Sequence, residues 1–465
     1  MTPYDEIVRQ NADDELRLWV RKLLDAKEEV VAFVDARLGG NGAGEYLGFA
    51  KGSFNLSFHI GFGGQRPSAL IRFPKPGHTH TPWRTEKVEN EVGIIEYLRE
   101  HTTIPLPRIR CWGLTEESPQ QLGPFIIMDF IEGTRLSTFL KQPTEDEDAE
   151  MILNPAMDEG TLDIIYDQLA DYVLQISRLE FPLIGAISKD DSGAWAVTRR
   201  PLTYDMNELA TGTGYPTDQL PTDHLASEPY HHTRDFFDSI ARQRLLHLDS
   251  QRNLIKDEAD VLRRFIARHR FKQLIPKYCI DNNDAGPFKV FCDDMQPANM
   301  LINPETLQIT ALLDFEFTNS MPAQFTYDPP WWLLLRGPDL WIDLHDNLDE
   351  FLSRYVPRME QFLRALEKVE DKSAAVGNGG LEKEPRLSAR MRDSWRMGRF
   401  WFNYAARTCL DMDDIYWHAL HDTTAGDGFS LLDEATQAEL EPLVVTKMQQ
   451  RKAYDDEWDV RFAEK

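Results

Sequence analysis

Asp294, Asn299 and Asp314 stand out because each lies beside a short apolar run in the segment 287–317. Each side chain is therefore placed where a strand ends and a loop can direct it, which is where functional groups are usually mounted. Oxygen ligands such as those of Asn299 and Asp314 suit Mg²⁺, which takes one or two protein ligands and fills its shell with water and phosphate oxygens. Asp294 is then free to accept a proton.

Short strands are needed to position these side chains, and the sequence predicts them at 289–291, 300–302 and 307–313. The turn at 303–306 contains Asn and Pro, which favour chain reversal, so we expect the last two strands to form a hairpin. That hairpin would bring Asp314 back towards Asn299. Asp and Asn also cap ordinary turns, which is the simpler interpretation for any one of the three residues. Their joint occurrence at this spacing favours a functional site.

The composition is that of a globular chain large enough for two lobes, with 465 residues, 42% hydrophobic and 11% aromatic. Its 51 Lys and Arg against 77 Asp and Glu give a formal charge of −26. Such a balance argues against a nucleic-acid partner, because affinity for a phosphate backbone rests on clustered cations. A solvated acidic surface explains the charge most simply, and attraction of a cationic substrate is a second explanation.

The compartment and membrane context follow from the cysteines and the apolar runs. The four cysteines are scattered without zinc or disulfide spacing, which is typical of reduced thiols in a cytoplasmic protein. The first ten residues lack the basic start and apolar run of a signal peptide, and the longest apolar stretch is too short to span a bilayer. We therefore expect a cytoplasmic protein with no membrane partner.

Upstream of this segment, helical periodicity over 13–37 is followed by strands predicted at 46–50, 56–62 and 69–73. The loop 51–55 contains small residues that can present backbone N–H groups to phosphate, although an ordinary hairpin turn explains it equally simply. Arg72 lies on the third of these strands, and Glu91 lies on a helix predicted over 86–100. The two can pair, either as a phosphate-binding cation held in a cleft or as a surface ion pair that contributes little.

Two more strands are predicted at 108–113 and 124–130, and an exposed linker follows them. A flat apolar ligand such as adenine can lie against such a strand and linker. The remainder of the chain is mostly helical by periodicity. Loops are expected at 142–160, 209–232 and 368–385, the last containing Gly377-Asn378-Gly379-Gly380.

The order of these pieces resembles the aminoglycoside phosphotransferase (APH) family, a branch of the protein-kinase-like fold. The resemblance rests on the loop 51–55, Arg72, the helix with Glu91, and then Asp294-x4-Asn299 and Asp314-Phe315-Glu316. It implies an α+β bilobal fold with a small antiparallel-sheet N-lobe and a larger, mostly helical C-lobe. The expected divisions are a helical extension at 1–45, the nucleotide-binding lobe at 46–131 and the C-lobe at 132–465.

The resemblance also implies roles for individual residues in an ATP- and Mg²⁺-dependent transfer. The implied roles are these: Asp294 as the catalytic carboxylate; Asn299 and Asp314 as the metal ligands; Arg72, paired with Glu91, on the phosphates; Ser53 and Asn55 above the phosphates; Asp129 and Ile131 as backbone partners of adenine.

The leading hypothesis is therefore a phosphotransferase acting on a hydroxyl of a small molecule, which the acidic bias permits to be cationic. The family's catalytic loop usually has His where this chain has Cys292, and Asp293 adds a carboxylate beside Asp294. These departures motivate an alternative, a kinase-like pseudoenzyme that binds a nucleotide, ligand or partner protein without phosphoryl transfer. A hydrolase using Asp293 and Asp294 as a carboxylate pair is a third and weaker alternative, because it leaves the other motifs unexplained.

Overall fold

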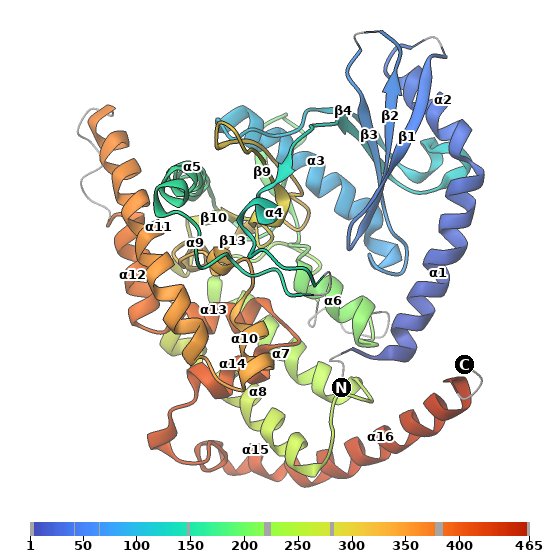
Figure 1. Cartoon of the computed structure of the whole chain (residues 1–465). Helices are drawn as coiled ribbons and strands as arrows, with labels where there is room; N and C mark the ends of the chain where they lie inside the picture. Colours follow the sequence, from blue (N-terminus) through green and yellow to red (C-terminus); the bar gives the residue numbers. More distant parts are fainter. Residues whose placement is uncertain are drawn as a thin grey trace.

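The computed structural model describes residues 4–40, 42–64, 66–146, 149–217, 225–279, 283–376 and 385–462. These residues form a small lobe built on an antiparallel sheet and a larger, mostly helical lobe (Figure 1). The α+β bilobal architecture predicted from the sequence is confirmed. No helix in the described ranges is both long enough and apolar enough to cross a membrane.

The sheet of the small lobe has the strand order β1-β2-β3-β5-β4, and every neighbouring pair is antiparallel. Its strands are β1 Gly44–Lys51, β2 Asn55–Phe62, β3 Ala69–Pro74, β4 Ile109–Gly113 and β5 Phe125–Asp129. All five confirm strands predicted from the sequence. The interior strands β2, β3 and β5 are mostly buried because helices cover both faces of the sheet.

Three helices form these covers: α1 Glu6–Asp25, α2 Lys27–Arg37 and α3 Arg84–His101. Apolar side chains of α1 and α2, such as Leu23 and Val34, pack with Phe58 and Ile71 in one core. Side chains of α3 pack against the opposite face of β5 in a second core. The helix α3 is thereby fixed between the sheet and the larger lobe, where its polar residues can reach both.

The larger lobe contains short strands and many helices. Its strands are β6 Thr134–Arg135, β7 Glu180–Phe181, β8 Ala186–Lys189, β9 Trp195–Arg199, β10 Phe288–Phe291, β11 Met300–Asn303, β12 Gln308–Leu312 and β13 Asn319–Met321. Its α-helices are α4 Leu136–Leu140, α5 Glu159–Ser177, α6 Tyr204–Gly212, α7 Thr233–Ser250, α8 Glu258–Tyr278, α9 Ala323–Thr326, α10 Pro338–His345, α11 Asp349–Val376, α12 Leu387–Arg396, α13 Arg399–Arg407, α14 Met412–Ile415, α15 Glu434–Ala438 and α16 Leu440–Phe462. One continuous apolar core holds this lobe together.

The three predicted loops are each wrong in part, the first only at its end, because α5 begins at Glu159 inside the segment 142–160. The loop expected from residue 368 is helical up to Val376, because its glycines all lie later in the sequence and Val369 is buried in the core. The loop expected from residue 209 begins later, since α6 continues to Gly212 with Leu209 fully buried. Parts of the three predicted loops, 147–148, 218–224 and 377–384, lie outside the described residues.

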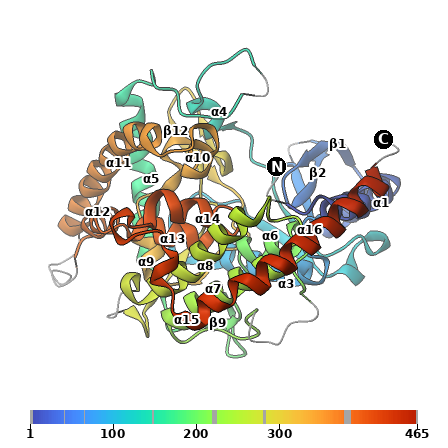
Figure 2. The same cartoon turned by 90° about the horizontal axis from the view of Figure 1, so that it is seen from below.

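The last helix, α16, runs along the underside of the larger lobe and ends near α1 (Figure 2). The Lys447 ammonium donates to the Gln251 carbonyl at 2.6 Å, and the Glu6 amide donates to the Tyr454 hydroxyl at 3.1 Å. The two ends of the chain are thus joined by direct contacts, and α16 links the larger lobe to the helix that supports the small one.

Candidate active site

The hairpin predicted to position the metal ligands is present. Strands β11 and β12 are antiparallel with Met300 opposite Leu312, and the Leu313 amide donates to the Asn299 carbonyl at 2.7 Å. Asp314, the next residue, is therefore adjacent to Asn299, as the turn at 303–306 predicted. Asp314 has a φ of 65°. Asp tolerates this left-handed conformation better than most residues, and strain of this kind is frequent at functional sites.

Asp294 lies in the loop after β10, and its carboxylate is held by its own loop. It accepts a hydrogen bond from the Asn299 amide nitrogen at 2.7 Å and another from Gln296. Burial, and then the charge of Asp314, raise the pKa of Asp294 to about 7. A carboxyl group that titrates near neutrality is suited to exchanging a proton with a hydroxyl.

Asp314 sits between charges of both signs. Its Oδ1 accepts a hydrogen bond from the Arg72 guanidinium at 3.3 Å. Burial, followed by the charge of Glu316, raises its pKa to about 6 even though Arg72 opposes the shift. The site thus has more carboxylate charge than its own cations balance, which is the electrostatic condition that favours a bound divalent cation.

The chemistry of the donor set is compatible with Mg²⁺, and the roles of Asn299 and Asp314 as metal ligands stay a prediction. Asn299 uses its amide nitrogen to hold Asp294, which leaves the amide oxygen for a cation, and Asp314 contributes a carboxylate. Among the described residues, no three His, Cys, Asp or Glu side chains are grouped to hold a metal. Magnesium does not need such a group, because it commonly uses one or two carboxylates together with substrate phosphates.

The pair between Arg72 and Glu91 predicted from the sequence is formed, and it is buried. The side chains are 12% and 1% exposed, so the surface-pair interpretation is wrong. The Arg72 Nε is also buried and has no hydrogen-bond partner among the described residues. An unsatisfied buried donor is costly, and a phosphate oxygen is an acceptor of the kind that guanidinium groups bind well.

Two further charged residues were not singled out from the sequence. Lys87, one helical turn before Glu91, donates to Glu316, and both side chains are almost wholly buried. Glu316 also accepts from the Asn55 amide at 2.6 Å, while Lys87 donates to the Asn55 oxygen at 2.9 Å. Two features of the sequence could have identified these residues. Lys87 lies four residues before Glu91 on the same helix face, and Glu316 lies two residues after Asp314.

The two residues predicted to lie above the phosphates differ in position. Ser53 is exposed at the tip of the loop between β1 and β2, whereas Asn55 is buried and already hydrogen-bonded to the Lys87–Glu316 pair. Between them, Phe54 packs edge-to-face on Tyr204 and Phe317, with ring centroids 5.6 Å apart in each case. The tip of the loop is therefore in contact with the larger lobe. The phosphate role of Ser53 and Asn55 stays a prediction.

At the junction of the lobes, Asp129 ends β5 and Ile131 follows it in the connection. The Asp129 amide donates to the Arg108 carbonyl at 3.0 Å, and its carboxylate accepts from Arg110 at 2.5 Å. Ile131 is partly buried beyond the end of the strand. The predicted contacts of both residues with adenine stay a prediction.

The two unusual residues of the catalytic loop have structural partners. Cys292 is buried in the main core, and burial raises the pKa of its thiol, so it remains neutral. Asp293 forms an ion pair with Arg407, and its carbonyl accepts from the Trp331 indole at 3.3 Å. Arg407 thus supplies a countercharge for the carboxylate next to Asp294.

Comparisons with known proteins address the family of the chain. Residues 45–362 match the family model described as "Phosphotransferase enzyme family". No curated protein matches the chain in a sequence search.

Similar solved structures include a putative aminoglycoside phosphotransferase from Ralstonia eutropha, 15% identical over 91% of this chain and 98% of that one, with a TM-score of 0.41. A choline kinase from Cryptosporidium parvum is 10% identical over 92% and 96% of the two chains, with a TM-score of 0.42. An ethanolamine kinase from Plasmodium vivax is 12% identical over 88% and 82%, with a TM-score of 0.40. The family model spans more than half of this chain, and the protein therefore belongs to the phosphotransferase enzyme family.

Proposed function

We propose that the protein transfers the γ-phosphoryl group of ATP, with Mg²⁺, to a hydroxyl group of a small molecule. The observation that carries this proposal is the meeting of Arg72, from a strand of the small lobe, with Asp314 of the larger lobe, beside Asn299 and Asp294. Phosphoryl transfer requires little from a protein beyond positioning, charge neutralisation and one carboxylate near the acceptor oxygen.

The residues of the chain have separate tasks in this reaction. Asp294, with its pKa near 7, accepts or orients the proton of the acceptor hydroxyl. Arg72 is held by Glu91, and its Nε–H, which lacks a partner in the described part of the chain, is offered to a phosphate oxygen. Asn299 and Asp314 would hold Mg²⁺, which neutralises the charge on the phosphates when bound. The buried Lys87–Glu316 pair acts on the site through its charges, since Glu316 raises the pKa of Asp314 and Lys87 lowers it.

The charge balance of the chain supports a cationic acceptor such as an amino alcohol. Its 51 Lys and Arg against 77 Asp and Glu give a formal charge of −26. An excess of negative charge attracts a protonated amine to the protein.

Calorimetry of ATP binding with and without Mg²⁺ tests the nucleotide and metal roles. We expect Mg²⁺ to strengthen ATP binding to the wild-type protein, and Asp314→Ala to lose most of that gain. Glu305→Gln is the matched control, because Glu305 is an exposed carboxylate on the turn of the same hairpin. Absence of ATP binding by the wild-type protein would refute the proposal.

Transfer itself is tested by ADP release with a panel of alcohols, amino alcohols and sugars. Asp294→Asn keeps the size of the side chain and removes its basicity, so turnover should fall by about 10²-fold or more while ATP binding is retained. Nucleotide binding without turnover on any member of the panel would favour the pseudoenzyme alternative instead.

We also propose a cytoplasmic location. Cys111, Cys292 and Cys409 carry free thiols, which supports a reducing compartment.

A further inference from the structure

A pocket lies on the side of the catalytic loop opposite Asp294. Consecutive residues of the loop point in different directions, so that Asp293 lines this pocket while Asp294 turns to Gln296 and Asn299. The walls come from α5, β10, the loop itself, α9 with the residues that follow it, and single residues of α12 and α13. The pocket is therefore distinct from the phosphoryl-transfer site, although both share one loop.

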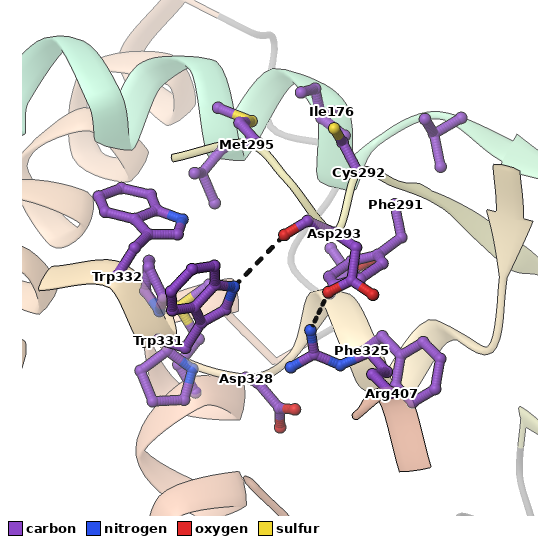
Figure 3. Close-up of a pocket in the computed structure, with 16 residues that line it drawn as sticks. Ile176, Phe291, Cys292, Asp293, Met295, Phe325, Asp328, Trp331, Trp332 and Arg407 are labelled. Carbon is purple, nitrogen blue, oxygen red and sulfur yellow. Dashed lines mark hydrogen bonds and ion pairs between the residues drawn. The ribbon is translucent and has the colours of Figure 1, made fainter. Parts of the chain in front are cut away.

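Most of the lining is aromatic or aliphatic. Phe291, Phe325, Trp331 and Trp332 supply rings, and Figure 3 shows both Trp side chains along one wall. The cavity volume is about 70 Å³, which is smaller than the roughly 150 Å³ of an enclosed cavity that binds benzene. The pocket also opens to solvent, so a ring can enter it in part while the rest of the ligand extends outwards. Apolar lining with a few polar groups is the usual character of a small-molecule site.

The polar groups of the pocket include one ion pair, and some of their hydrogen-bond donors have no partner among the described residues. Asp293 accepts from Arg407 through Oδ1, and 24% of its side-chain surface remains exposed (Figure 3). The Arg407 side chain is only 6% exposed, and its Nε has no hydrogen-bond partner among the described residues. The Thr326 hydroxyl, also buried in the lining, likewise lacks a partner in the described part of the chain. Unmet donors of this kind are costly unless a ligand or water satisfies them.

The charges of the lining select against an ionised ligand. Arg407 opposes a cation at this position, while Asp293 and Asp328 oppose an anion. Asp328 is already hydrogen-bonded by Ser394 and Asn403, so it does not need a ligand to satisfy it. A hydroxyl group can accept from Arg407 or Thr326 and donate to Asp293 without adding charge.

We propose that this pocket is a second ligand site, separate from the site of phosphoryl transfer, for a small neutral aromatic molecule carrying a hydroxyl group. The rings lie against the Trp and Phe side chains, and the hydroxyl lies at the Asp293–Arg407 pair. Trp331 lines the pocket and also donates to the Asp293 carbonyl, so an occupant contacts a group that supports the backbone next to Asp294.

Calorimetry without nucleotide, with 2-naphthol as the probe, tests this proposal. We expect saturable binding of 2-naphthol at one site per chain. Its affinity should be at least about tenfold higher than that of the anion 2-naphthoate or the cation 2-(aminomethyl)naphthalene, a difference of about 1.4 kcal/mol in binding free energy. Absence of saturable binding by the wild-type protein, or equal binding of the three probes, would overturn the proposal.

Variants locate the bound probe. Val173→Phe adds a ring to the pocket wall contributed by α5, and it should weaken 2-naphthol binding about tenfold or more. Ile164→Phe is the matched control on the same helix, since Ile164 is 49% exposed and lies outside the lining. Asp294→Asn should bind 2-naphthol like the wild type, which separates this site from the proposed catalytic function. Unchanged 2-naphthol affinity in Val173→Phe, or loss of 2-naphthol binding in Asp294→Asn, would contradict the assignment. A crystal of the wild-type protein soaked in 2-naphthol locates the probe even if a variant fails to fold.

Discussion

Replacing Lys87 by Met should destabilise the protein strongly, because it leaves a buried carboxylate without its cation. The Lys87 and Glu316 side chains are 1% and 4% exposed. In the variant, Glu316 retains the Asn55 amide as a hydrogen-bond donor but loses its nearest positive charge. Removing one partner of a buried ion pair typically costs about 3–5 kcal/mol in the free energy of unfolding.

The double variant Lys87→Met with Glu316→Leu separates the charge effect from the packing effect. Buried pairs replaced by apolar residues of similar volume often retain stability, but the buried Asn55 amide loses both of its partners in this variant. We therefore expect the double variant to be more stable than Lys87→Met without reaching the stability of the wild type. The side chains would then show a large coupling energy, as contacting buried residues do. Lys452→Met is the control, because Lys452 is 79% exposed in its pair with Asp456 and such a surface pair contributes little to stability.

Urea unfolding followed by circular dichroism and tryptophan fluorescence measures these differences. A loss below about 1 kcal/mol for Lys87→Met would refute the assignment of a buried, mutually dependent pair. A double variant that loses as much as the sum of the two single variants would show that the residues contribute independently.

Other changes test the electrostatics and the backbone. Burial raises the pKa of Asp413, but Arg268 and Arg264 outweigh it and lower that pKa to about 2 from 3.8. Because the pKa of Asp413 is lower in the folded protein, the ionised carboxylate contributes about 2 kcal/mol to the free energy of unfolding above pH ~4, and this contribution is lost as the pH falls towards 2. In Asp413→Asn, the free energy of unfolding should therefore depend less on pH in that range. Gly77→Ala should lower the thermal midpoint of unfolding more than Gly193→Ala. Both glycines have a positive φ, but only at Gly77 would an added Cβ lie 2.6 Å from the Ala12 carbonyl oxygen. Equal shifts in the midpoint would show that backbone strain alone decides the effect.

Local sequence signals predicted the small lobe and the hairpin of the site well. Alternating and apolar runs located β1 to β5, and the turn at 303–306 correctly placed Asp314 beside Asn299. These features depend on interactions between residues close in sequence or on strong burial patterns. The loop predicted from residue 368 is wrong over 368–376 for a local reason as well, because these residues precede the glycine-rich segment and support a helix.

The sequence by itself determined the strands of the small lobe and the mostly helical remainder through periodicity, and the order of its motifs indicated the family through resemblance, with the two-lobed fold that the resemblance implies. Only the tertiary structure decided which charged side chains pair with one another. Lys87, Glu316 and Asn55 are far apart in the chain, and their hydrogen bonds exist because α3 packs between the sheet and the larger lobe. The pairing of Asp293 with Arg407 likewise spans 114 positions, and α13 must reach the catalytic loop to form it. Such long-range contacts depend on the packing of whole elements, which no local pattern specifies.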